Sequence, residues 1–306
     1  MGIILSGLIG IYSYLYLLFE LIIFLVFFCL IIFIFIFLLY SLAKSYFFKK
    51  FKPRKFNFEK DLYILGHRGI PVLEHENTLE SFDLINKYDI DGTEFDVNIS
   101  LDKKLYVYHD YNLYRLFGID KNLKEETSQI LDNLKIRLFR SKINENIVES
   151  KIPELKEAFE KLKDCRLLNL EIKSNSLKNI GLEKQVAELI KEFNLENKIV
   201  ISSFDPFCLY RFSKYLPQVP RGLLVSKTGL AKYLRDMWFL AFSKADFIHF
   251  EAAFIGSSIV QKLRNKGYSI VFWGVNSVQL FERALKDKPI FIISDIPHIL
   301  KEYFER

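Results

Sequence analysis

The chain begins with a long apolar stretch and then changes to short apolar runs separated by amphipathic segments. Residues 21–40 form an unbroken apolar run without a polar face. At about 1.5 Å of rise per residue, a helix of that length spans the ~30 Å hydrocarbon core of a bilayer. The pattern therefore predicts one transmembrane helix, with residues 1–43 as a membrane anchor.

Two other interpretations of the N-terminal segment stay open. Residues 3–19 are also apolar and only Glu20 separates them from the main run, so they could form a second span in a hairpin. Residues 41–43 (Ser-Leu-Ala) would suit a signal peptidase. A cleaved signal peptide is disfavoured, because its apolar region usually has ~7–15 residues and follows a basic segment.

From residue 61 onward, the apolar runs are typical of strands buried on both faces, with amphipathic stretches between most of them. Eight such strands over about 245 residues favour a (β/α)8 TIM barrel of the α/β class. The alternative is a doubly wound open sheet. The expected strands are 62–65, 92–97, 167–172, 198–202, 222–225, 246–250, 269–273 and 290–293, and the expected helices are 78–87, 181–193, 206–215, 228–243, 257–265 and 278–285.

The interval between the second and third expected strands is too long for a single helix. A turn at residues 100–104 followed by an apolar run at 105–108 indicates a hairpin. The residues from there to 150 are charged and irregular. We therefore expect residues 98–150 to form an insertion over one mouth of a barrel that spans residues 61–306.

Basic charge is concentrated just after the apolar run. The net charge is +6, and six basic residues lie between Lys44 and Lys55 with no acid among them, so the rest of the chain is neutral. This distribution speaks against a nucleic-acid-binding domain and predicts a basic juxtamembrane linker at 44–60. Because basic residues stay on the cytoplasmic side of a span, we expect a single-pass membrane protein with its barrel in the cytoplasm, near anionic lipid.

Three carboxylates are expected to converge inside the barrel mouth. Glu94 and Asp96 lie two apart on the second strand, so their side chains point the same way, and Glu171 and Lys173 do likewise on the third. Such carboxylates cannot all stay ionised without compensation, and all-oxygen ligation favours a hard cation. We expect one divalent cation, Mg²⁺ or Ca²⁺. The alternative is an ion-pair network with Lys173 and Arg68.

Two histidines are expected at the same rim. His67 follows the first strand and His109 follows the hairpin. Two histidines near a metal can divide the roles of general base and general acid. Arg68 and Lys173 supply the cations that a phosphate needs. The combination indicates metal-assisted hydrolysis of a phosphate ester.

Nine short motifs recur in order along the barrel part of the chain: LGHRG at 65–69, ENTLESF at 76–82, DGTEFDV at 91–97, YVYHD at 106–110, IPELKEAFE at 152–160, LEIKS at 170–174, SSF at 202–204, WGVN at 273–276 and ISDIP at 293–297. In these motifs the chain resembles the glycerophosphodiester phosphodiesterase family, over about residues 62–305. Its departures from the family pattern include His75, where the family usually has Pro, and Ser294, where it usually has Thr.

The resemblance implies a (β/α)8 barrel with a small insertion after the second strand. It implies hydrolysis of glycerophosphodiesters to sn-glycerol 3-phosphate and an alcohol. The roles that it implies are acid-base catalysis by His67 and His109, metal binding by Glu94, Asp96 and Glu171, phosphate binding by Arg68 and Lys173, and contacts to the glycerol side by Phe204 and Trp273.

Two alternative functions stay open. A lysophospholipase D acting on lysophospholipids at the membrane would suit the anchor, and a catalytically inactive membrane scaffold is the alternative of another class. The expected partners are the substrate and membrane lipid, with no nucleic acid and no obligate protein partner. Aromatic and aliphatic residues of the insertion could face lipid or pack the insertion onto the barrel: Tyr106, Tyr108, Tyr111, Tyr114, Leu116 and Phe117.

Overall fold

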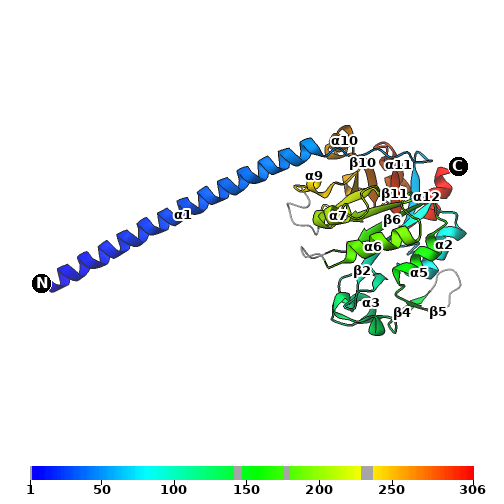
Figure 1. Ribbon diagram of the computed structural model, residues 1–306, viewed down its shortest axis with the longest axis horizontal. Helices are drawn as coiled ribbons and strands as arrows, with labels where there is room; N and C mark the ends of the chain where they lie inside the picture. Colours follow the sequence, from blue (N-terminus) through cyan, green and yellow to red (C-terminus); the bar gives the residue numbers. More distant parts are fainter. Residues whose placement is uncertain (1, 141–146, 175–179, 229–236) are drawn as a thin grey trace. The chain divides into compact units, whose positions relative to one another are not determined.

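The computed structural model describes residues 2–140, 147–174, 180–228 and 237–306. The chain forms two compact units, Met1–Lys50 and Phe51–Arg306. The first unit is one continuous helix, α1 (Gly2–Lys50), drawn in blue in Figure 1. Within it, Tyr12–Ala43 is long and apolar enough to cross a membrane. Since the helix continues through Glu20, the hairpin considered for its two apolar parts is not formed.

The second unit is a closed barrel of eight parallel strands, which confirms the predicted fold and excludes the open sheet. Strand β1 (Tyr63–His67) pairs with both β2 (Gly92–Ile99) and β11 (Phe291–Ser294), and this double pairing closes the sheet. The barrel strands between β2 and β11 are, in order around the sheet, β6 (Leu167–Ile172), β7 (Ile199–Ser203), β8 (Arg221–Val225), β9 (Phe247–Glu251) and β10 (Ser269–Trp273).

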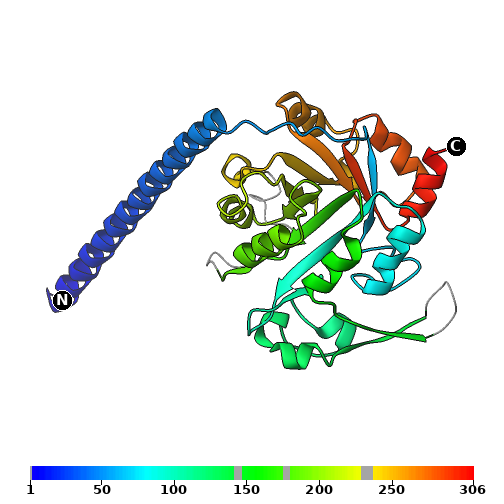
Figure 2. The same ribbon diagram turned by 45° about the vertical axis from the view of Figure 1, so that its right-hand side comes forward.

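Helices surround the barrel on its outer side (Figures 1 and 2). The helix expected at 228–243 falls partly outside the described residues, because 229–236 are not among them. Of the remainder, residues 237–239 form a turn rather than helix, with Met237 at a φ of 54°. The outer helices are α2 (Leu79–Lys87), α5 (Leu155–Leu162), α6 (Leu182–Glu192), α7 (Pro206–Phe212), α9 (Leu240–Ser243), α10 (Ser258–Asn265), α11 (Val278–Leu285) and α12 (Pro297–Phe304).

An insertion follows β2, as predicted. Strand β3 (Leu105–Val107) runs antiparallel to β2, and β4 (Lys135–Arg140) pairs with β5 (Ile147–Lys151) in a separate two-stranded sheet. Short helical turns lie between β3 and β4: α3 (Tyr114–Phe117), η1 (Leu123–Glu125) and α4 (Ser128–Leu131). The insertion has its own apolar core of Tyr106, Tyr108, Leu113, Phe117, Leu123, Leu131, Ile136 and Ile152.

The part of the expected linker 44–60 that follows α1 belongs to the barrel unit. Its side chains alternate, with Arg54, Phe56 and Phe58 partly buried and the residues between them exposed. Phe56 and Phe58 pack against Phe247, the first residue of β9, with ring centroids 5.7 and 6.0 Å apart. This segment therefore covers the end of the barrel at which the strands begin, which we call the floor.

Candidate active site

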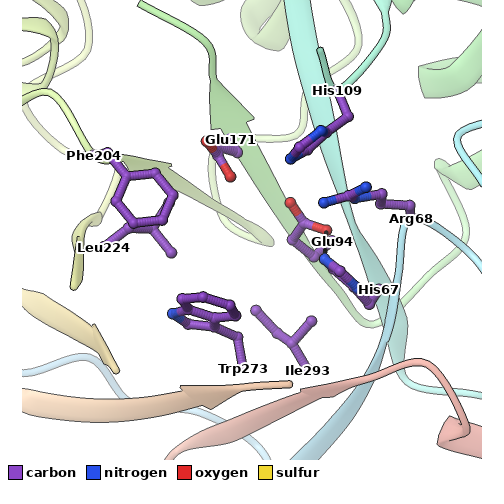
Figure 3. Close-up of a pocket in the computed structure, with 9 residues that line it drawn as sticks. All are labelled: His67, Arg68, Glu94, His109, Glu171, Phe204, Leu224, Trp273 and Ile293. Atoms are coloured by element: carbon purple, nitrogen blue, oxygen red, sulfur yellow. Dashed lines mark ion pairs between the residues drawn. The ribbon is translucent and has the colours of Figure 1, made fainter. Parts of the chain in front are cut away.

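The residues expected to act on a phosphate ester gather at the opposite end of the barrel, where the strands end. A cavity of about 140 Å³ opens there. Figure 3 shows its polar side chains on one wall and apolar side chains on the facing wall. Of the nine expected site residues, all but Asp96 and Lys173 line it; its full lining is His67, Arg68, Glu94, His109, Glu171, Phe204, Leu224, Trp273 and Ile293.

The three carboxylates converge as the strand spacing predicts. The register of β2 with β6 places Asp96 beside Glu171, and Glu94 lies two residues earlier on the same face of β2. All three are buried, and each offers an oxygen within 4.8 Å of the others. Bringing three acidic groups this close in a region shielded from water requires positive charge nearby.

Two cations of the chain supply part of that charge. Lys173 Nζ lies 2.6 Å from Glu171 Oε1 and 2.9 Å from Asp96 Oδ1, and Arg68 Nε lies 3.4 Å from Asp96 Oδ2. Burial alone would raise the pKa of Asp96, but Lys173 and Arg68 outweigh it and hold that pKa well below its usual range. Asn77 adds a hydrogen bond to Asp96 Oδ2 at 2.8 Å. The ion-pair network considered as an alternative is therefore present around Asp96.

For Glu94, the same two cations do not outweigh burial and the neighbouring carboxylates. Its burial, together with the charges of Asp96 and Glu171, raises its pKa well above the usual range. Its Oε2 atom is buried and has no hydrogen-bond partner among the residues that the structure describes. The pKa of Glu171 is also raised, chiefly by burial. Because the network leaves these carboxylates short of positive charge, the cluster fits a hard divalent cation.

His67 is oriented by a carboxylate that directly follows the last strand. Its Nδ1 atom lies 2.6 Å from Asp295 Oδ1, and Asn276 Nδ2 donates to Asp295 Oδ2 at 2.5 Å. Burial opposes ionisation of Asp295, but its hydrogen bond to His67 lowers the pKa overall. Since an ionised carboxylate can only accept, Nδ1 carries the proton. Nε2 is then left facing the carboxylate cluster, 3.9 Å from Glu94 Oε2.

His109 is oriented in the same way by its neighbour in sequence. Its Nδ1 atom lies 2.6 Å from Asp110 Oδ1, and Arg115 donates to Asp110 Oδ2 at 2.6 Å. Arg115 also donates to Glu76 at 2.6 Å, and Glu76 accepts from Arg68 at 3.1 Å. A chain of alternating charges thus connects the second histidine to the arginine beside the first.

The carboxylate partners of the two histidines are functional candidates that the sequence reasoning missed. Asp110 and Asp295 lie inside the recognised motifs, so their positions were visible. Their contacts were not, because His67 and Asp295 are 228 positions apart and meet only when the barrel closes. Asn77, which lies in the recognised stretch at 76–82, also contacts the acidic cluster.

The apolar wall holds two aromatic rings at a right angle. The rings of Phe204 and Trp273 have centroids 6.2 Å apart, and Trp273 Nε1 donates to the backbone carbonyl of His249 at 3.2 Å. A wider groove of about 480 Å³ adjoins this wall and continues toward the insertion. It is lined by His109, Asp110, Tyr111, Asn112, Tyr114, Arg115, Glu171, Lys173 and Phe204.

Known proteins share both this fold and this sequence pattern. Residues 67–299 match the glycerophosphoryl diester phosphodiesterase family. The chain is 30% identical to a glycerophosphodiester phosphodiesterase of Caldanaerobacter subterraneus subsp. tengcongensis, over 78% of this chain and 95% of that one. It is 26% identical to a lysophospholipase D of Homo sapiens, over 78% and 85% of the two chains. A phosphodiesterase of Oleispira antarctica, solved in complex with the product sn-glycerol-3-phosphate, superposes with a TM-score of 0.64 at 22% identity, covering 80% of this chain and 97% of that one.

Proposed function

The chain belongs to the glycerophosphoryl diester phosphodiesterase family and is a phosphoric diester hydrolase, and we propose that it cleaves glycerophosphodiesters to sn-glycerol 3-phosphate and an alcohol. The observation that carries this proposal is the pairing of two oriented histidines with an under-compensated acidic cluster in one small cavity. The same residues argue against an inactive scaffold, since every expected catalytic group is present.

His67 and His109 act as the proton-transfer pair. One accepts a proton from the attacking water while the other donates a proton to the oxygen of the leaving alcohol as its bond to phosphorus breaks. Asp295 and Asp110 keep both Nδ1 atoms protonated. Each Nε2 is then available for the reacting oxygens.

Glu94, Asp96 and Glu171 would hold one divalent cation, Mg²⁺ or Ca²⁺, which when bound offsets the negative charge that develops on the phosphoryl oxygens. Arg68 lines the same cavity and binds the phosphate. Lys173, which faces the adjoining groove, lowers the pKa of Asp96, opposes the rise in the pKa of Glu171, and assists in phosphate binding.

The aromatic wall receives the glycerol side of the substrate. Phe204 and Trp273 offer flat apolar surfaces to the carbon atoms of glycerol, while the polar wall opposite binds the phosphate. The cavity of about 140 Å³ is well below the ~300–1,000 Å³ of sites for larger ligands, which suits a small polar substrate.

The helix α1 anchors the enzyme in a membrane, with the barrel in the cytoplasm. The basis is the apolar span and the six basic residues at 44–55 that follow it. A reporter fused after Arg306 tests the orientation. Activity of an alkaline phosphatase fusion, which requires export, would place the barrel on the outer side.

A second candidate function is the hydrolysis of lysophospholipids, because one relative is named a lysophospholipase D. The bond broken would be the same, and only the group attached to glycerol would differ.

Choline release from glycerophosphocholine by the purified full-length protein tests the main proposal. We expect release with Mg²⁺ or Ca²⁺, loss of release in excess chelator, and recovery when the cation is restored. Full release in chelator would contradict the role of the carboxylates, and no release with either cation would contradict the activity.

A further inference from the structure

The second histidine of the site comes from the insertion and not from a barrel strand. His109 follows β3, and the pairing of this segment with β2 ends at the hydrogen bond from the backbone N–H of Tyr108 to the carbonyl of Asp96, at 3.2 Å. The chain then bends at His109. The other groups proposed to transfer a proton or to hold the cation lie on barrel strands. The position of His109 relative to them therefore depends on contacts beyond the strand pairing.

A buried amide on β2 makes such a contact. Asn98 lies two residues beyond Asp96 on β2, and its side chain is buried. Its Nδ2 atom donates to the carbonyl of Tyr108 at 2.8 Å and to the carbonyl of Asp110 at 3.2 Å. These two carbonyls stand on either side of His109 in the chain. One amide group therefore holds both ends of the bend.

The two acceptors determine which kind of side chain this position requires. An amide nitrogen carries two hydrogens, one for each carbonyl, whereas a hydroxyl group has one and an ionised carboxylate has none. Because both partners of Asn98 are carbonyl oxygens, only the NH₂ end of its amide can face them. Asparagine is uncommon inside strands, so its presence at a buried position of β2 agrees with a specific role for this amide.

Asn98 also holds the residue that orients the imidazole ring. The carboxylate of Asp110 lies 2.6 Å from Nδ1 of His109, and the carbonyl of the same aspartate is the second acceptor of Asn98. Figure 3 shows the imidazole of His109 directed into the cavity, toward Glu94 and Glu171. A shift of the bend would therefore move the ring and its carboxylate partner together, away from the other reacting groups.

We propose that Asn98 is a positioning residue, whose amide fixes the bend at His109 and so places the second histidine beside the carboxylate cluster. The inference rests on the proposed function, because it assumes that His109 transfers a proton in the reaction. Asn98 lines neither the cavity nor the adjoining groove, so it acts through His109 alone. Because a misplacement of about 1 Å can cost ~10²-fold in rate, loss of the amide should lower kcat and leave KM little changed.

A double-mutant cycle tests whether Asn98 acts through His109. Choline release from glycerophosphocholine, at saturating cation, is measured for the full-length native chain, Asn98→Ala, His109→Ala and the double variant. We expect Asn98→Ala to lower kcat by ~10–100-fold in the native chain and by less than ~2-fold in the His109→Ala background. An equal factor in both backgrounds would overturn the proposal. So would near-normal kcat in Asn98→Ala, or a loss that excess cation restores.

Two further variants separate the hydrogen-bond donor from packing. Asn98→Asp keeps the size of the side chain without its N–H groups and should lose as much kcat as Asn98→Ala; repeating the cycle with it removes the effect of the added charge, which acts in both backgrounds. Ser100→Ala is the matched control. Ser100 is also buried, and its hydroxyl donates to Asp102 at 2.6 Å and accepts from the backbone N–H of Lys104 at 2.9 Å, at the turn of the same hairpin.

The control variant should keep kcat within about 2-fold of the native value, because the turn lies at the other end of the hairpin from His109. If it were as slow as Asn98→Ala, any damage to the hairpin would have the same effect, and the specific role of Asn98 would be wrong. Native turnover in Asn98→Asp would also contradict the proposal, since the N–H donors would then not matter.

Hydrogen exchange gives a readout that does not depend on activity. In Asn98→Ala, the backbone amides of residues 108–113 should exchange at least ~10-fold faster than in the native chain, while those of β6 to β11 should not change. Unchanged exchange at 108–113 would overturn the proposal. If exchange rises there and His109→Ala keeps native turnover, or no protein releases choline, the proposed function is wrong and the contact between Asn98 and the bend is still supported.

Discussion

The two ends of the barrel differ in how far their buried carboxylates are compensated by positive charge. At the floor, one buried carboxylate, Asp246, has two arginines, since Arg54 binds it directly and Arg221 Nη2 lies 3.7 Å away. Both arginines also donate to backbone carbonyls. At the mouth, three buried carboxylates share two cations, and Glu94 Oε2 has no hydrogen-bond partner in the described part of the chain.

This difference separates a structural use of charge from a functional one. A buried ion pair with satisfied hydrogen bonds fixes geometry, whereas a buried carboxylate without compensation costs stability. The excess of negative charge at the mouth is what a bound cation would offset. Mutations at the mouth should therefore change activity more than stability, and mutations at the floor should do the reverse.

The largest effect should come from the histidines. Replacing His67 or His109 by Ala should lower kcat by ~10²–10⁴, the usual contribution of a positioned acid or base. Thermal unfolding should shift little, because both side chains are partly exposed. Near-normal turnover in a folded variant would remove that histidine from the mechanism.

A smaller loss should follow from Asp295→Asn. The amide can donate to Nδ1 of His67, and the proton of the neutral ring would then lie on Nε2 instead of Nδ1. Because Nε2 could no longer accept a proton, we expect kcat to fall by about 10–100-fold with KM little changed. Asp295→Glu, which keeps a carboxylate, should recover part of the loss. A purely structural role would instead lower the unfolding temperature of both variants together.

A mutation at the floor should change stability more than activity. Arg54→Ala leaves Asp246 with one cation and frees several carbonyls, and we expect a loss of about 1–3 kcal/mol, reduced from the ~3–5 kcal/mol of a fully buried pair because Arg54 is 36% exposed. Lys55→Ala, at the exposed neighbouring position, is the matched control and should change stability by less than ~0.5 kcal/mol. The kcat of Arg54→Ala for glycerophosphocholine should be unchanged. A large loss of kcat at unchanged stability would contradict a purely structural role for the charges at the floor.

The smallest effect should be a gain in stability from Glu94→Gln without metal. Because the pKa of Glu94 is raised in the folded state, its contribution to stability falls as pH rises from about 4.5 toward the folded pKa. The variant removes that penalty, so its advantage in unfolding temperature over the native chain should grow with pH. Divalent cations should raise the unfolding temperature of the native chain more than that of the variant. If the difference in unfolding temperature does not depend on pH, nearby positive charge already compensates the Glu94 carboxylate.

The fold was predictable because the barrel strands are bounded apolar runs. The ranges of β6 and β10 match the expected ones, and the others differ by two residues or fewer at each end. The segment after α1 was expected to be only a basic juxtamembrane linker, because basic residues are concentrated there. In this segment, Arg54, Phe56 and Phe58 alternate with exposed residues. Such alternation is typical of an extended segment packed on one side, but the prediction used only the basic charge of the segment.

The candidate site was predictable in its members more than in its contacts. Strand spacing brought Glu94, Asp96 and Glu171 to one place, because residues two apart on a strand share a face. The division of charge among them could not be predicted. It depends on which oxygen Lys173 reaches, and that follows from side-chain packing in the closed barrel.

The docked segment before β1 also determines where the enzyme can be shortened. The family match begins at residue 67 and the expected barrel at 61, and a chain cut at either position would lose Arg54, Phe56 and Phe58. Such a chain would then expose Tyr63 and Phe247 at the floor to water and leave Asp246 without its bidentate contact. For recombinant production, a soluble enzyme should begin at Phe51, where the helix ends and the barrel unit starts.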